Sequence, residues 1–296
     1  MTFSSLRTSL TEYLFKPVSP WPAAVYRILF GLCVCATLLL LHGDWSNWFG
    51  VHGWITPDTI DQAETGFRLN LFALAPHSER WVTALYYLIL GASITLTLGL
   101  GTRVSSVIVY LGLNALNQRN PIILHGGDTF LRSAAFFLIF ASSAEVLSLD
   151  SLIRRYRKPS ESVPRLISPW PLRLIQYQLA LLYLASFWWK AHGNTWWNGT
   201  ALYYVVNLGE VRRFPIPHIL HTAWVLRLGG WCAMAFELLF PCLVWFKRFR
   251  NPILIAGLLF HLSLEYALNV PMFQWEVLSA YVLFLNFGER PTQTTR

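Results

Sequence analysis

The residues best suited to chemistry lie in a polar segment at 187–200, which reads Phe-Trp-Trp-Lys-Ala-His-Gly-Asn-Thr-Trp-Trp-Asn-Gly-Thr. Lys190 is the only lysine or arginine between Arg173 and Arg212, and it follows an apolar run at 172–189. A charged amine at a membrane edge is costly unless it reaches water, headgroups or a partner. In a low-dielectric site a lysine can lose its proton and act as a base or nucleophile. Lys190 is therefore the first candidate catalytic residue.

Two interpretations of Lys190 are open. Trp188 and Trp189 could form the apolar wall of a site in which the amine acts as a base. Because Lys190 stands at the end of a predicted membrane span, its side chain could instead extend to the lipid headgroups. From these residues alone, the second interpretation is the simpler one.

A second candidate group is a polar segment between two apolar runs. It contains His125, Gly126, Gly127, Asp128 and Arg132. The paired glycines let a ligand or another helix approach the backbone closely. Asp128 can cap the helix that follows, and Arg132 lies one turn further on. No Gly-Lys-Ser/Thr follows, so this is no phosphate loop. Capping explains Asp128 without catalysis, and ligand binding is the alternative.

Ionisable side chains inside apolar runs form a third group, made up of Glu237, Glu265, Glu276 and His261. Such residues are functional candidates in a membrane protein, although pairing between helices also explains them. His261 and Glu265 are four residues apart and share a helix face. Two ligands are too few for a metal site, and no His-Glu-x-x-His occurs. We predict no bound metal.

The depths of these groups suggest that they share one site. Glu265 lies fourteen residues after Asn251, about 21 Å into an apolar core about 30 Å thick. Lys190, His125 and Asp128 map to the same outer half of the membrane. We therefore expect a cavity open to the outside, although scattered interface groups would give the same depth map.

The composition identifies the kind of element that must position these residues. The chain has 296 residues, of which 54% are hydrophobic and 13% charged. Soluble domains carry about 25% charged residues, so this composition indicates an integral membrane protein. The net charge of +8 comes from basic residues in loops beside apolar runs, which excludes nucleic acid as the expected partner. The four cysteines lie inside apolar runs and predict neither a disulfide framework nor a metal site.

We predict an all-α, polytopic helix bundle of about eight spans in the cell inner (plasma) membrane. The expected spans are 22–42, 80–100, 104–119, 130–149, 171–189, 223–246, 252–269 and 271–287. The third is short, holds Asn114 and Asn117, and could be tilted or broken. Basic residues concentrate on one side, which predicts that both termini are cytoplasmic. The loop at 150–170 is then a solvated cytoplasmic linker, and 43–79 and 190–222 are outside segments.

Three parts of the chain follow from this organisation. Residues 1–21 form an N-terminal segment with a short interfacial helix at 3–16, for which a frayed terminus is the alternative. Residues 22–288 form the transmembrane domain. Residues 289–296 form a short C-terminal tail.

At these motifs the chain resembles the bacterial HTTM proteins, relatives of vitamin K-dependent gamma-carboxylase. Lys190, Gly193, Trp196 and Gly199 match the family's lysine followed by Gly-x-x-Trp-x-x-Gly, with Ser186 and Phe187 where the family has alanine and glycine. A second family element matches Arg119, Asn120, Gly126, Gly127, Asp128 and Arg132. Glu237 with Pro241, and His261 with Leu262, look like the family's later helices. The resemblance covers roughly residues 20–288.

The resemblance implies a role for each candidate residue. In the carboxylase, the matching lysine is regarded as the base that deprotonates reduced vitamin K, after which oxygen generates a stronger base and carbon dioxide adds to a glutamate side chain. It therefore implies a carboxylase-like lyase or oxygenase with Lys190 as the base. His125 and Glu265, which map to the same outer half of the membrane, are the other predicted catalytic residues. The residues implied to bind a reduced quinone such as vitamin K are Trp188, Trp189, Trp196, Gly126, Gly127, Asp128, Arg132, Glu237 and His261.

Three functions remain open at this point. The first is a quinone- or lipid-linked membrane enzyme with Lys190 as its base. The second is a non-enzymatic maturation or export factor for a secreted peptide, similar to the sporulation-delaying protein B group. The third is a transporter that uses the broken segment at 190–207. The expected partners are the lipid bilayer, a small lipophilic ligand, and a secreted peptide or a protein that delivers it, because the carboxylase's large lumenal domain has no counterpart before Arg296.

Overall fold

The computed structural model describes residues 3–63, 66, 69–159 and 163–285. Within these ranges the chain forms helices joined by turns, together with two isolated bridges and no strand, in agreement with the predicted all-α class. The contacts divide the chain into two compact units, Met1–Ile175 with Leu285–Arg296, and Gln176–Phe284. Each unit is described separately.

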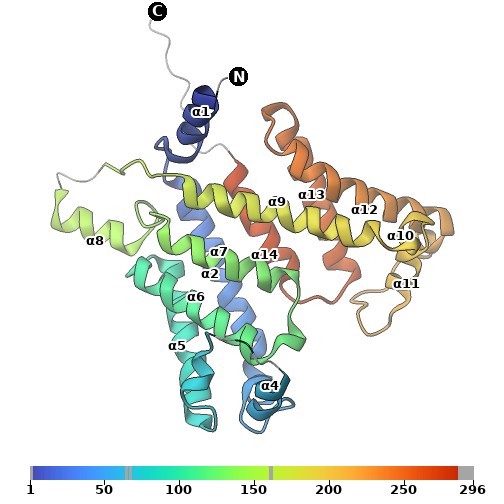
Figure 1. The fold of residues 1–296 in the computed structure, drawn as a ribbon, viewed down its shortest axis with the longest axis horizontal. Coiled ribbons are helices and arrows are strands. Elements are labelled where there is room, and N and C mark those ends of the chain that lie inside the picture. Colours follow the sequence, from blue (N-terminus) through green and yellow to red (C-terminus); the bar gives the residue numbers. More distant parts are fainter. Residues whose placement is uncertain (1–2, 64–65, 67–68, 160–162, 286–296) are drawn as a thin grey trace, which may run out of the picture. The chain divides into compact units, whose positions relative to one another are not determined.

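The first unit contains the helices from α1 to the start of α9 (Figure 1). Its α-helices are α1 (Phe3–Phe15), α2 (Trp21–Leu41), α3 (Trp45–Phe49), α4 (Pro57–Ala63), α5 (Glu79–Leu98), α6 (Thr102–Arg119), α7 (Gly126–Phe140), α8 (Leu149–Arg157) and the start of α9 (Trp170–Ala191). Single 3₁₀ turns lie at His42–Asp44, Leu71–Leu74 and Pro121–Ile123. Consecutive packing of α2 on α5, α5 on α6 and α6 on α7 forms the core of this unit.

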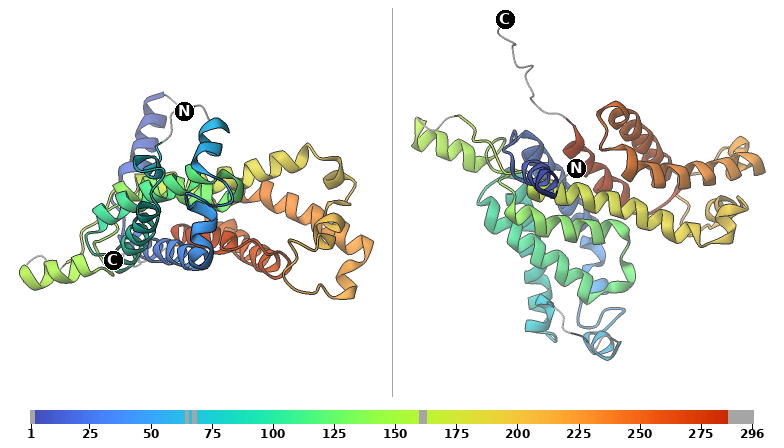
Figure 2. Two further views of the ribbon diagram at one scale, coloured as in Figure 1. Left: turned by 90° about the horizontal axis from the view of Figure 1, so that it is seen from below. Right: turned by 45° about the horizontal axis from the view of Figure 1, so that its top comes forward.

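The second unit contains the rest of α9 and the helices that follow it. These are α10 (Asn194–Trp197), α11 (Ala201–Asn207), α12 (Ala223–Leu243), α13 (Lys247–Ala267) and α14 (Phe273–Ser279), with 3₁₀ turns at His218–His221 and Ala280–Phe284. In this unit α12 packs against α11 and α13, and α13 packs against α14, as the orange and red ribbons of Figure 2 show.

A helix lies at each of the eight predicted spans. Among the described residues, three helical stretches could cross a membrane by length and composition: Trp21–Phe49, Glu79–Leu98 and Ala223–Leu243. The arrangement of eight spans with both termini inside stays a prediction. The third predicted span forms one continuous helix, α6, without a break at Asn114 or Asn117. The predicted tail at 289–296 and the end of the last predicted span lie outside the described residues.

The fourth predicted span is shorter than expected. We predicted helix over 130–149, but α7 ends at Phe140. The Arg27 guanidinium, from α2, donates to the carbonyl oxygens of Ser143, at 3.1 Å, and Leu147. Leu147 also has a φ of 49°, which is outside the helical region. Residues 141–148 therefore wrap around a buried arginine, and the apolar run gave no sign of this contact.

The predicted solvated linker at 150–170 is also wrong in part. Its first half forms α8, with Ser148 as N-cap: the Ser148 hydroxyl accepts from the Ser151 amide at 2.9 Å. Three arginines in the last turn, Arg154, Arg155 and Arg157, favour helix at this end because they oppose the negative end of the helix dipole. We misread a basic amphipathic helix as a charged loop.

The N-terminal helix predicted at 3–16 is present as α1. The backbone that follows it is tied to the segment before α9, because Val18 and Ile167 exchange two backbone hydrogen bonds of 2.9 and 3.0 Å. The Arg173 guanidinium lies 4.5 Å from the centre of the Tyr13 ring, an attractive cation–π distance. These contacts join the end of α1 and the segment after it to the start of α9.

Candidate functional site

The polar residues at the end of α9 lie on a single face of that helix. Tyr183, Ser186 and Lys190 are spaced three and four residues apart, which places them in one row along an α-helix. The partner element is α12, which carries Glu237 and also Phe236 and Phe240, whose rings pack against Tyr183. The part of α9 that carries these residues and all of α12 belong to the second unit.

Lys190, Ser186 and Glu237 form a closed hydrogen-bonded triangle. The Lys190 ammonium donates to Ser186 Oγ at 2.7 Å and also forms an ion pair with Glu237 Oε1. The Ser186 hydroxyl donates to the same Glu237 oxygen at 3.0 Å. A hydrogen-bonded pair of opposite charges has the geometry through which a proton can pass between nitrogen and oxygen.

This triangle fixes where the Lys190 side chain lies, and its role as a base stays a prediction. The side chain of Lys190 is 21% exposed and that of Glu237 only 4%, so the amine turns inward to a buried acid. A lysine extended to headgroups would carry its amine outward. The second carboxylate oxygen, Glu237 Oε2, is buried without a hydrogen-bond partner in the described part of the chain. A buried, unsatisfied acceptor is costly, so it marks a position where a ligand hydrogen-bond donor would be stabilised.

Trp196 supplies the aromatic surface beside the amine. Its ring centre lies 5.2 Å from Lys190 Nζ, within cation–π range. The chain reaches this position through a tight turn: the Trp196 amide donates to the Gly193 carbonyl, and the Gly199 amide to the Trp196 carbonyl. Gly199 has a φ of 77°, and a Cβ there would collide with the Arg227 side chain. The Gly-x-x-Trp-x-x-Gly segment therefore forms the turn that places the Trp196 ring beside the Lys190 amine.

Trp188 and Trp189, which could form an apolar wall beside the amine, lie exposed at the end of α9. Their side chains are 60% and 77% exposed, as expected for aromatic residues that face lipid at a helix end. Trp188 packs on His192, whose Nδ1 lies 2.8 Å from the Trp188 carbonyl oxygen. At the amine, an aromatic surface is provided by Trp196, and cofactor binding by Trp188 and Trp189 stays a prediction.

A second polar chain lies deeper in the same unit. Tyr183 Oη is 2.6 Å from both His261 Nε2 and Tyr281 Oη, and His261 Nδ1 contacts Gln274 Oε1. All four side chains are buried. Because Gln274 Oε1 can only accept, His261 carries its proton on Nδ1 and accepts at Nε2. Tyr183 therefore donates to His261, and Tyr281 donates to Tyr183.

The four residues of the third group have four different surroundings, and Glu237 has been described with Lys190. His261 belongs to the buried chain just described, whereas Glu265 forms an ion pair with Arg213 at the surface end of α13. The loop that carries Arg213 is joined to the end of α13 by the Arg213 and Asn269 amides, which donate to the Ala267 and Val211 carbonyls. The Glu265–Arg213 ion pair therefore helps to hold the loop around Arg213 against α13. The catalytic role of Glu265 stays a prediction. Glu276 is fully buried in α14.

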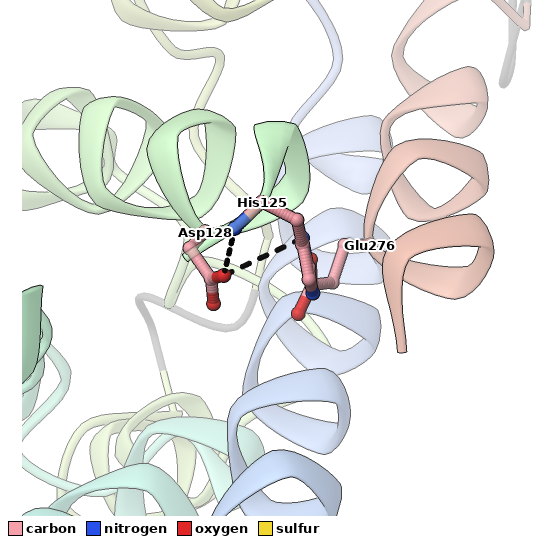
Figure 3. A group of neighbouring side chains, drawn as sticks. All are labelled: His125, Asp128 and Glu276. Carbon is pink, nitrogen blue, oxygen red and sulfur yellow. Dashed lines mark hydrogen bonds and ion pairs between the residues drawn. The ribbon is translucent and has the colours of Figure 1, made fainter. Parts of the chain in front are cut away.

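The glycine-rich group lies in the first unit, at the N-terminus of α7. The His125 amide donates to Asp128 Oδ2 at 2.9 Å (Figure 3). The Gly127 amide donates to His125 Nδ1 at 3.1 Å. This is a capping box, so the capping role predicted for Asp128 is confirmed. Gly126 and Gly127 form the first turn of α7, and Arg132 is half-buried one turn later. Catalysis by His125, and cofactor binding by the others, stay predictions.

Arg119 and Asn120, which match the family pattern, act on the segment at 43–54. Arg119 donates to the Gly50 carbonyl at 2.6 Å, and Asn120 donates to the Trp48 carbonyl at 3.1 Å. Glu79, at the start of α5, accepts from the Val51 amide at 2.7 Å. These buried bonds fix the first predicted outside segment to the helix ends.

Sequence reasoning missed Ser186, Tyr183, Tyr281 and Gln274. The first two could have been found, because they stand four and seven residues before Lys190 and share its helix face. The other two could not, because they lie far from Tyr183 and His261 along the chain and only the fold brings them together.

The comparisons with known proteins agree with the motifs. Neither the curated proteins nor the solved structures contain a match to this chain. A family model described as the HTTM domain matches residues 15–288, nearly the whole chain. In the part of the chain that the structure describes, three helical stretches are long and apolar enough to cross a membrane. The chain is therefore a membrane protein of the HTTM domain family.

Proposed function

We propose that this protein is a membrane enzyme that removes a proton from a small lipophilic acid, with Lys190 as the base. The single observation that supports this most is the triangle of Lys190, Ser186 and Glu237, in which a lone amine is held against a buried acid. Basic side chains at the membrane edge that act only as anchors do not need such a partner.

Proton transfer within the pair makes the base available. When the shared proton moves from Lys190 Nζ to Glu237 Oε1, an ion pair becomes a neutral amine and a neutral acid. In a low-dielectric site the neutral form avoids the desolvation cost of two charges. Lys190 Nζ can then accept a proton from a ligand hydroxyl while Glu237 keeps the first proton. Ser186 orients both groups through its hydroxyl.

A reduced quinone fits the donors and acceptors of the site. Glu237 Oε2 is a buried acceptor without a partner among the described residues, and a phenolic hydroxyl is a donor. The Trp196 ring offers a flat apolar face beside the amine. A bound reduced quinone would supply an acidic hydroxyl and reducing equivalents, in keeping with the carboxylase resemblance. The protein's own part is to orient the hydroxyl and to hold the proton at Lys190.

The location proposed for this enzyme is the inner membrane, with eight spans and the site in the outer half. The small lipophilic ligand would enter from the bilayer. If the substrate also includes a peptide, we propose that a partner protein delivers it to the outside segments at 43–79 and 190–222.

Ligand binding by the purified full-length protein tests this proposal. The probe is a reduced naphthoquinone, and its dimethyl ether, which lacks the acidic hydroxyls, is the ligand control. Tryptophan fluorescence quenching under anaerobic conditions reports binding. We expect Lys190→Met and Glu237→Gln to weaken binding of the reduced probe about tenfold, or about 1.4 kcal/mol. Binding of the ether should not change.

The matched control variants are Lys247→Met and Glu210→Gln, which remove the same charges from exposed positions of the same unit. Both should bind like the unmodified protein. If the chain ignores the reduced probe but binds a secreted peptide tightly, the enzyme proposal is wrong. The maturation-factor function then takes its place.

A further inference from the structure

The short helix α8 (Leu149–Arg157) has two chemically opposite faces. Its apolar residues fall within an arc about 100° wide on a helical projection, at 100° per residue. They are Leu149, Leu152, Ile153 and Tyr156, with exposed fractions of 36%, 58%, 41% and 88%. The rest of the circumference carries Arg154, Arg155 and Arg157, and Lys158 follows directly. A water-soluble surface would not leave four large apolar side chains on one exposed helix face.

Only a small part of the α8 surface packs against its own unit. Ser151 is the buried residue of this helix. Arg154 is held back against the protein by Glu145, with 2.8 and 3.2 Å between their guanidinium and carboxylate atoms. Arg155 and Arg157 are exposed and stand at the two borders of the apolar arc. In Figures 1 and 2, α8 projects from the edge of the first unit.

The beginning of α8 is fixed to the end of a candidate membrane span. The Asp150 amide donates to the Gly99 carbonyl at 2.9 Å, just past the end of α5. The Asp150 carboxylate accepts from the Gly101 and Thr102 amides at 2.9 and 3.0 Å, at the start of α6. Burial raises the pKa of Asp150, but these hydrogen bonds outweigh it and hold the pKa below its ordinary value. The beginning of α8 is therefore tied to the end of α5, a candidate membrane span, and to the start of α6.

We propose that α8 lies in the membrane interface and binds anionic phospholipids. The apolar arc is immersed among the acyl chains, and Arg155 and Arg157 reach the headgroups on either side. Interfacial helices are recognised by this pattern of a strong apolar face with basic residues beside it. Arginine donates two parallel hydrogen bonds to a phosphate group, so the headgroup phosphate is the chemistry that fits. This proposal is independent of the proton-transfer site in the second unit.

Hydrogen–deuterium exchange of the full-length protein in lipid nanodiscs tests the proposal. One set of discs contains phosphatidylcholine alone, and the other contains phosphatidylcholine with phosphatidylglycerol. We expect peptides covering 149–157 to exchange at least about threefold more slowly in the anionic discs. The difference should shrink at high salt because mobile ions screen the headgroup charge.

The double variant Arg155→Gln/Arg157→Gln should lose this lipid difference while its exchange in the neutral discs is unchanged. The control Arg7→Gln/Arg103→Gln removes two exposed arginines of the same unit outside α8 and should keep the difference. Equal exchange of the unmodified protein in both kinds of disc overturns the proposal. So does a lipid difference that survives in Arg155→Gln/Arg157→Gln.

Discussion

Lys190 and Glu237 depend on each other at the residue scale. Breaking a buried ion pair by removing one partner leaves an uncompensated charge, at a cost of about 3–5 kcal/mol. A pair that served only stability would be replaced by apolar side chains at little cost. The additional features here are the Ser186 hydroxyl, which contacts both groups, and the acceptor at Glu237 Oε2. These features are better suited to moving a proton than to bracing two helices.

Lys190→Arg separates the charge of the side chain from its ability to lose a proton. A guanidinium keeps its proton near neutral pH, so the variant retains an ion pair with Glu237 but has no base. We expect it to bind the reduced naphthoquinone probe within about threefold of the unmodified protein, or about 0.7 kcal/mol. The naphtholate absorption that the unmodified protein induces in the probe should be missing. If the arginine variant induces the same absorption, Lys190 acts only as a charge.

Tyr183→Phe tests the buried chain below the site. It leaves His261 without its donor and Tyr281 without its acceptor, and an unsatisfied buried group costs about 1–3 kcal/mol. We expect the free energy of unfolding in detergent to fall by about 2 kcal/mol. Tyr203→Phe, at a side chain that is 56% exposed, is the control and should change it by less than about 0.5 kcal/mol. Equal effects would mean that the chain of hydrogen bonds carries no stability.

Single residues were predictable where their chemistry was unusual for their surroundings. Lys190 and Glu237 were both identified because an ionisable group in an apolar run is rare. Their pairing was not predicted, because it joins residues that are 47 positions apart. Asp128 was assigned correctly as a cap because capping is local in sequence. Ser186 was noted only as a departure from the family pattern, although its hydroxyl completes the triangle.

At the scale of elements, the junction of α2, α5 and α8 shows how close packing sets helix ends. Gly99 ends α5 with a φ of 72°, and a Cβ at this position would collide with the Arg27 guanidinium and Ser148. Gly101 has a φ of 56° and open space around its Cα. Both glycines therefore have a left-handed backbone conformation, but only Gly99 is closely packed against other side chains.

Gly99→Ala should destabilise the protein more than Gly101→Ala. Both substitutions place an alanine in the left-handed region, at about 1–2 kcal/mol. The first adds overpacking against Arg27 and Ser148, at about 1–3 kcal/mol more. Thermal unfolding of the two variants in the same detergent measures the difference. An equal loss of thermal stability in the two variants would mean that the Arg27 side chain moves aside without an energetic cost.

Helix positions were largely predictable because long apolar runs can satisfy their backbone only as helices in a membrane. The ends were less predictable. The end of α7 depends on Arg27, which lies 116 residues before Ser143 in the chain. The helix α8 was missed because its charge suggested a loop, although its apolar residues recur with helical spacing.

At the scale of the whole molecule, the open question is which helices cross the bilayer. The three candidate stretches satisfy length and composition together. Other helices carry polar groups, such as Asn114 and Asn117 in α6 and the basic residues that begin α13. A helix that packs its polar face against neighbours can still span, since the bilayer sees only its outer face. The charge asymmetry of the loops predicts eight spans with both termini inside.

Reporter fusions measure this topology directly. A fusion after Ser160 and another after Arg290 should both report the cytoplasmic side, and a fusion after Gly209 should report the opposite side. A cytoplasmic signal after Gly209, or an outside signal at either other position, contradicts the eight-span topology. The result does not depend on whether Lys190 is catalytic.

Infrared difference spectroscopy of the full-length protein tests the central claim most directly, because it observes the proton on Glu237. The spectrum is recorded before and after addition of the reduced naphthoquinone probe. When Lys190 accepts a proton from the probe, Glu237 keeps the proton that Lys190 gave it. A band of a protonated carboxyl group should therefore appear with the reduced probe, and be absent with the dimethyl ether and in Glu237→Gln. No such band, or one that persists in Glu237→Gln, would contradict the claim that Lys190 and Glu237 transfer a proton.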